Sequence, residues 1–100
     1  MSLFSLTQLA LHDLKEIARF TQHEWGREQR NNYLKQFDTS FNLLAQNPEL
    51  GKVCDDIRQN YRKFPQGSHV IFYKVTSEQH ILIVRILHKS MDVNPGRLII

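Results

Sequence analysis

Apolar residues in the first half of the chain recur at helical spacing. One stripe runs from Thr7 to Trp25 in steps of four, three, one, three and four, through Ala10, Leu14, Ile17, Ala18, Thr21 and Trp25. This period predicts an amphipathic helix. Thr7 can cap its start, and Gly26 can adopt the left-handed conformation that closes its end.

A second stripe follows at once and ends at the dipeptide Asn47-Pro48. Its members are Tyr33, Phe37, Phe41 and Leu44. Two helices separated by so short a turn must fold back on each other as an antiparallel hairpin. Both stripes are too apolar to face water, so a third element has to cover them.

The second half of the chain changes to strand-like composition. Short runs rich in β-branched and aromatic residues, separated by turn residues, span Tyr61 to Pro65, His69 to Thr76 and His80 to His88. They predict a three-stranded antiparallel meander. Met1 to Leu6 is long enough for one more strand, and Glu49 to Asn60 reads as an irregular connection. The predicted fold class is α+β, with an N-terminal strand, a two-helix hairpin and then the meander.

Alternation along these strands predicts which residues face the helices. Val70 and Phe72 form an apolar set that we expect to pack on the hairpin, while Tyr73 and Arg85 mark a partly open face. In the last strand, strict alternation groups Ile81, Ile83, Arg85 and Leu87 on one face, and Leu82, Val84, Ile86 and His88 on the other.

Length and composition restrict the class of protein. One hundred residues, 41% hydrophobic and 23% charged, predict a single globular domain over residues 1–100 and disfavour disordered, collagen-like and coiled-coil chains. No apolar run approaches the roughly 20 residues of a membrane-spanning helix, and no basic residue precedes an apolar block at the start. The single cysteine, Cys54, has no partner for an internal disulfide. These features favour a cytoplasmic protein without membrane contact.

Charge is spread unevenly along the chain. Residues 1–50 carry five cations against six anions, whereas residues 51–100 carry eight cations against four anions. The second half also holds His69, His80 and His88. This asymmetry favours an anionic partner such as RNA, DNA or an acidic protein segment, although a merely solvated basic surface fits equally well.

Metal and nucleophile chemistry find little support. The five histidines and Cys54 follow no zinc-ligand spacing, so we expect neither a metal site nor a cofactor. Asp55 and Asp56 disfavour a thiolate at Cys54. The four glycines are too far apart for a phosphate-binding loop.

Cations on and beside the predicted strands form the remaining constellation. They are Arg58, Arg62, Lys63, Lys74, Arg85, His88 and Lys89. Such a surface could hold phosphates, and a histidine beside it would permit metal-free RNA cleavage. The alternative is that these side chains only solvate an open sheet face.

Four segments together resemble the ParE branch of the RelE/ParE toxin superfamily. They are Leu11 to Gly26 (LHDLKEIARFTQHEWG), Asn47 to Gly51 (NPELG), His69 to Val75 (HVIFYKV) and Arg85 to Asp92 (RILHKSMD). The resemblance covers about Leu6 to Asn94. It implies the toxin of a type II toxin-antitoxin pair, which poisons DNA gyrase, blocks replication and is neutralised by a ParD-type antitoxin. It also implies a non-catalytic protein that can associate with DNA indirectly, through the antitoxin complex.

The RelE branch of the same superfamily offers an alternative, because its members cut messenger RNA on the ribosome. Arg62 or Lys63, Arg85 and His88 would occupy comparable places here. However, no second acid-base partner for His88 is evident. RNA cleavage by general acid-base catalysis normally requires one group that accepts a proton and another that donates one. We therefore favour gyrase poisoning.

The resemblance also suggests two contact surfaces. An antitoxin helix would lie in a groove beside the hairpin and an extended segment would add to a sheet edge, so we expect Trp25, Tyr33 and Phe37 to be partly exposed or close to that groove. Their stripe positions also favour the alternative that all three are core residues. For gyrase we expect contact through His88, Lys89, Ser90, Met91 and Asp92. The end of the chain, Arg97-Leu98-Ile99-Ile100, departs from the family pattern.

Overall fold

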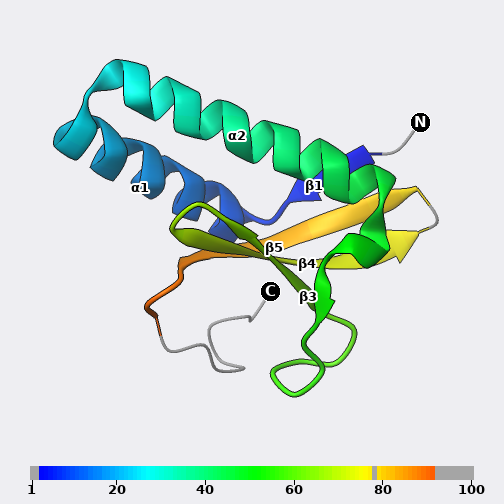
Figure 1. Ribbon diagram of the computed structural model, residues 1–100. Helices are drawn as coiled ribbons and strands as arrows, with labels where there is room; N and C mark the ends of the chain where they lie inside the picture. Colours follow the sequence, from blue (N-terminus) through cyan, green and yellow to red (C-terminus); the bar gives the residue numbers. More distant parts are fainter. Residues whose placement is uncertain (1–2, 78, 92–100) are drawn as a thin grey trace.

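The computed structural model describes residues 3–77 and 79–91. Its elements are β1 (Leu3–Leu6), α1 (Gln8–Trp25), α2 (Arg27–Gln46), a 3₁₀ turn η1 (Pro48–Leu50), β2 (Lys52–Val53), β3 (Arg62–Gln66), β4 (His69–Ser77) and β5 (His80–His88). The predicted α+β order of strand, helical hairpin and meander is confirmed (Figure 1). The short strand β2 was not predicted, because it falls inside the stretch expected to be irregular.

Local signals bound the helices as the sequence indicated. The hydroxyl of Thr7 accepts a hydrogen bond from the Ala10 N–H at 3.0 Å and donates one to the Val84 carbonyl at 2.7 Å, so the cap also ties α1 to β5. Gly26 adopts a φ of +93° between the helices, which favours glycine over residues with a side chain. The hairpin therefore reverses at a single residue.

The five strands form one sheet in the order β1-β5-β4-β3-β2. β1 runs parallel to β5, and the other neighbours are antiparallel. The helical hairpin lies across one face of this sheet, and its turn projects beyond the sheet margin (Figure 1). The end of the hairpin that carries the interhelical turn consequently has no strand beneath it, whereas the rest of the hairpin lies over the sheet (Figure 1).

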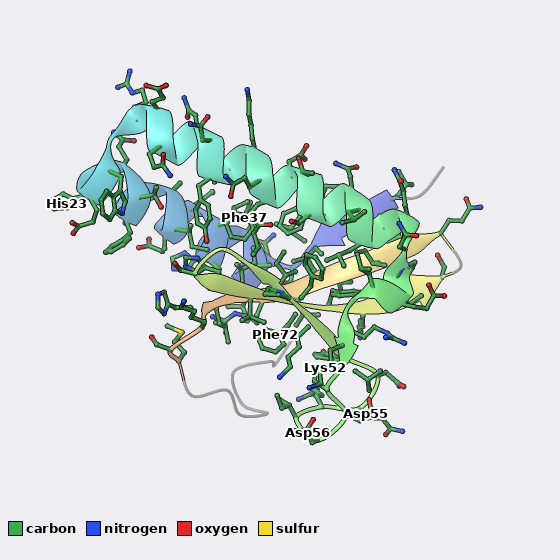
Figure 2. All side chains as sticks on the ribbon, in the orientation of Figure 1. His23, Phe37, Lys52, Asp55, Asp56 and Phe72 are labelled. Atoms are coloured by element: carbon green, nitrogen blue, oxygen red, sulfur yellow. The ribbon has the colours of Figure 1, made fainter. Side chains whose placement is uncertain are left out.

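The helix-facing core differs from the predicted one. Ile71 and Tyr73 of β4 pack against Phe37 and the rest of the hairpin, whereas Phe72 faces away from it. The expectation that Val70 and Phe72 pack on the helices is therefore wrong. Figure 2 shows Phe37 on the helix side of the sheet and Phe72 on the opposite side. That opposite side holds a second apolar cluster, built from Cys54, Tyr61, Phe72, Val84 and Leu87.

A register shift in β5 explains a further difference. Phe72 pairs with Arg85 and Tyr73 pairs with Ile83, so Val84 is an extra residue without an opposite partner. This bulge interrupts the alternation of faces. Ile86 joins Ile81 and Ile83 beneath the helices, and Leu87 joins the second cluster, which reverses the predicted sides of both residues.

Within the described ranges, no helix has both the length and the apolar character required to cross a membrane.

Candidate functional site

A groove of about 630 Å³ lies between the helical hairpin and one end of the sheet. It is lined by Glu16, Ile17, Phe20, Thr21 and Trp25 of α1, by Gln29 and Tyr33 of α2, and by Ser68, His69 and His88 at the sheet end. Two of its apolar side chains are strongly exposed, Phe20 at 62% and Trp25 at 72%. Exposed aromatic residues gathered in a concave surface are typical of a binding site.

The groove arises from a mismatch between the hairpin and the sheet. The apolar stripe of α1 continues to Trp25, while the sheet ends earlier, so the last turn of the stripe has no strand beneath it (Figure 1). Ile17, earlier in the same stripe, is only 7% exposed. The apolar stripe of α1 is therefore buried or half-buried over most of its length but exposed to solvent in its last turn.

Tyr33 connects the groove to the β3-β4 turn. Its hydroxyl accepts a hydrogen bond from the Ser68 N–H at 3.1 Å, donates to the Gln66 carbonyl at 2.9 Å and lies 2.8 Å from His69 Nδ1. A neutral His69 with its proton on Nδ1 satisfies all three contacts, because it can donate to the Tyr33 oxygen. Burial raises the pKa of Tyr33, so its hydroxyl stays protonated.

His69 and His88 face each other across β4 and β5. They are directly paired residues, with ring centroids 5.4 Å apart in an edge-to-face arrangement. Burial lowers the pKa of His69 to about 4, and neighbouring His88 adds to the effect, while Asp13 opposes it. His69 is therefore neutral at neutral pH. The predicted strands already placed His69 at the start of one strand and His88 at the end of the next. An antiparallel pairing of these strands would have brought the two histidines together, but we did not draw that conclusion from the sequence.

The three residues predicted for antitoxin contact divide between surface and core. Trp25 and Tyr33 line the groove, whereas Phe37 is 0% exposed and meets only the second part of the expectation, that it lies close to the groove. Its ring packs beneath the site, with centroids 4.9 Å from Tyr33 and 6.0 Å from His69. The alternative that all three are core residues is wrong for Trp25. Phe20 was missed, although an aromatic residue outside the apolar stripe was a signal for it.

Two of the proposed phosphate ligands bind the protein itself. The Arg85 guanidinium donates to both oxygens of Asp13, at 2.8 and 2.9 Å, and these hydrogen bonds raise its pKa. The side chains of Arg85 and Asp13 are only 19% and 11% exposed. Arg62 donates to the Gly51 carbonyl at 2.7 Å and to that of Glu49 at 3.3 Å. Both guanidinium groups therefore donate to acceptors within the protein, which makes them poor phosphate ligands.

The ribonuclease candidates also fail to gather in one place. Arg62 pairs with Tyr73 and Lys63 with Phe72, so these two neighbours point to opposite faces of the sheet. His88, the last residue of β5, pairs with His69 at the start of β4, whereas Arg62 and Lys63 pair with Tyr73 and Phe72 farther along β4. His69 does provide a second acid-base group beside His88, but the contact between the rings leaves no space for a phosphoryl group between them.

The segment expected to contact gyrase continues from the groove. His88, Lys89 and Ser90 are exposed, and Met91 is 44% exposed. The Ser90 N–H donates to His88 Nδ1 at 3.1 Å, and the Lys89 N–H donates to the Ser68 carbonyl at 2.9 Å. Asp92 and the terminal residues 97–100 lie outside the described residues.

Over residues 3–77 and 79–91, no three histidine, cysteine, aspartate or glutamate side chains are placed to share a metal ion.

The fold is a small α+β domain in which a helical hairpin covers one face of a five-stranded sheet and forms a groove with one end of it. A chain of the solved chromosomal ParDE TA system from P. aeruginosa superposes with a TM-score of 0.74 at 19% identity, covering 88% of this chain and 96% of that one. This likeness concerns the fold.

Sequence comparison gives the family. The model of the family described as "ParE toxin of type II toxin-antitoxin system, parDE" matches residues 4–93 of this chain. The chain therefore belongs to the ParE toxin family. Toxin ParE1 of Mycobacterium tuberculosis is 42% identical over 93 residues, covering 93% of this chain and 95% of the relative. Toxin ParE1 of Caulobacter vibrioides is 33% identical over 92 residues, covering 92% and 94%. The resemblance to ParE toxins drawn from the sequence is confirmed.

Proposed function

We propose that this chain is the toxin of a ParDE-type pair, that it blocks replication by poisoning DNA gyrase, and that a ParD-type antitoxin neutralises it. The observation that carries the proposal is the family match over residues 4–93, joined to an exposed binding groove. Gyrase acts on DNA inside the cell, so the proposal also places the toxin in the cytoplasm.

The groove suits an amphipathic antitoxin helix. Phe20 and Trp25 would cover one face of such a helix, and Glu16 and Gln29 at the same surface could contact its polar margin. An extended antitoxin segment would add to an edge strand, and β1 lies at one edge of the described sheet. The end of β3 is a poor acceptor, because Pro65 has no N–H and the Gln66 carbonyl already accepts a hydrogen bond from Tyr33.

Binding, without bond cleavage, is the mode of action that the geometry favours. Arg62 and Arg85 are engaged with protein acceptors, and the contacting rings of His69 and His88 exclude a phosphoryl group from the space between them. The exposed segment His88–Met91 remains our candidate for gyrase contact, together with Asp92 beyond it. A protein-binding surface of this kind distributes its affinity over several side chains.

The decisive experiment is a supercoiling assay with purified gyrase, ATP, relaxed plasmid and the purified toxin. We expect linear DNA to accumulate and the cognate antitoxin to suppress it. His88→Ala and Lys89→Ala should lower potency in steps of a few fold, whereas loss of a general acid or base would cost about 10²-fold or more. Normal supercoiling alongside cleaved messenger RNA would overturn the proposal in favour of a RelE-type ribonuclease.

A further inference from the structure

Three lysines lie side by side on the sheet face that the helices do not cover. Lys52 of β2 is directly opposite Lys63 of β3, and Lys63 is directly opposite Phe72 of β4. Directly opposite residues share a face, as do residues two apart on a strand, so Lys74 joins the same surface. Phe72 belongs to the cluster on the side away from the hairpin. We call Lys52, Lys63 and Lys74 the lysine row.

Contacts with the second cluster confirm this placement. Lys74 Nζ lies 5.7 Å from the centre of the Tyr61 ring, and Arg58 Cζ lies 5.8 Å from it, which adds a fourth cation to the surface. Burial raises the pKa of Cys54; the positive charge of Lys63 opposes that rise, and the negative charges of Asp56 and Asp55 add to it, so all three side chains lie close to this cluster.

The lysine row makes no ion pair with Asp55 or Asp56, the two acidic residues close to the same cluster. Like charges directly opposite each other on a sheet are destabilising, yet in the described part of the chain Lys52, Lys63 and Lys74 form no ion pair. Asp55 accepts a hydrogen bond from the Asn60 N–H at 2.9 Å within the loop between β2 and β3. Figure 2 places Asp55 and Asp56 on that loop, farther from the sheet than Lys52. Against these two carboxylates, the three lysines and Arg58 leave the face with an excess of positive charge.

We propose that the lysine row, with Arg58, binds the phosphate backbone of duplex DNA without reading its sequence. Lysine ammonium groups on neighbouring strands supply several phosphate contacts, and such contacts provide affinity with no base specificity. The surface is poorly suited to single-stranded RNA, because its aromatic residue Tyr61 is 3% exposed and offers no ring for base stacking. The inference rests on the proposed function in one respect: a gyrase poison works beside cleaved DNA, where direct contact would reinforce its grip.

The test is fluorescence anisotropy of a labelled 20-base-pair duplex titrated with the purified toxin between about 25 and 150 mM salt. We expect Lys63→Gln/Lys74→Gln to weaken binding by about tenfold or more and to reduce the slope of log affinity against log salt by about 2. The matched control Lys15→Gln/Lys35→Gln removes the same charge from exposed positions on the helices and should change affinity by less than about twofold. Lys63→Arg/Lys74→Arg should retain binding, because the charges remain.

Three results would overturn the inference: equal weakening in the helix-lysine control, tighter binding to a single-stranded RNA of the same length, or no binding of duplex at low salt. Circular dichroism and urea unfolding establish that each variant folds. The gyrase assay separates the two proposals. Lysine-dependent DNA binding by a chain that leaves gyrase unaffected supports this inference and refutes the proposed function. Trapped gyrase without any DNA binding by the toxin does the reverse.

Discussion

Asp13 of α1 and Arg85 of β5 form a two-pronged ion pair, with Arg85 Nε 2.8 Å from Oδ2 and Nη2 2.9 Å from Oδ1. The same carboxylate accepts the Ile86 N–H at 3.0 Å, two residues after the bulge at Val84. The pair thus fastens the first helix to the strand where the sheet register changes. It also explains why Arg85, a candidate phosphate ligand by sequence, is unsuited to that role.

Removing Asp13 should destabilise the fold. Asp13→Ala leaves a largely buried guanidinium without its carboxylate and the Ile86 N–H without an acceptor, so we expect a loss of about 2–4 kcal/mol in the free energy of unfolding. Urea unfolding followed by circular dichroism measures it. Glu16→Ala is the matched control, because its ion pair with Arg19 is exposed and should contribute less than about 1 kcal/mol. Equal losses in the two variants would contradict this prediction.

Trp25 and Phe37 should separate binding from stability. Trp25→Ala changes a 72% exposed side chain, so we expect unfolding to shift by no more than about 0.5 kcal/mol. Affinity for the antitoxin should fall by about tenfold or more, since aromatic anchors dominate interfaces. Phe37→Ala empties a fully buried position and should cost about 3–5 kcal/mol of stability.

Calorimetric titration with the antitoxin, alongside urea unfolding, checks both variants. Leu43→Ala, 41% exposed on α2 and outside the groove, serves as the control for loss of a surface apolar residue. Unchanged antitoxin affinity in a folded Trp25→Ala variant would remove the groove from the interface.

Stability should depend on pH through His69. Its pKa is about 4 in the folded protein, against an ordinary value of 6.5. Between these values the unfolded chain binds a proton at His69 that the folded chain lacks. The stability associated with neutral His69 is therefore complete above pH 6.5 and is lost as the pH falls toward 4. We expect His69→Gln to have a smaller loss over this range in urea unfolding, by at most about 1.4 kcal/mol per pH unit. Parallel curves for the two proteins would show that His69 titrates normally.

Gly51 should not tolerate a side chain. The Tyr73 hydroxyl accepts the Gly51 N–H at 2.8 Å and donates to the Pro48 carbonyl at 2.6 Å, and a Cβ at Gly51 would collide with the Tyr73 ring. Because Tyr73 is 0% exposed and has no room to move, we expect Gly51→Ala to cost about 1–3 kcal/mol in urea unfolding. Tyr73→Phe isolates the loss of the hydroxyl. Full stability of Gly51→Ala would show that the ring can shift.

Periodicity, cap residues and turn residues were sufficient to predict the elements whose signals are local. The bounds of α1 follow from the stripe ending at Trp25, the cap at Thr7 and the turn at Gly26, and β5 spans the predicted His80 to His88. β2 was not predicted because a strand of two residues is too short to show an alternating pattern. The side of the sheet covered by the helices was predicted wrongly, since Ile71-Tyr73 and Val70-Phe72 are almost equally apolar and alternation cannot rank two apolar faces.

Sequence by itself determined the class, the order of elements and the family resemblance, because helix periods, caps and motif order act over a few residues at a time. Only the tertiary structure decided the surfaces that we propose for binding. The exposure of Trp25 depends on where the sheet ends beneath α1, the bond from Arg85 to Asp13 joins residues 72 apart, and the lysine row requires the register of three strands. Each of these is a long-range contact, whose geometry no local pattern contains.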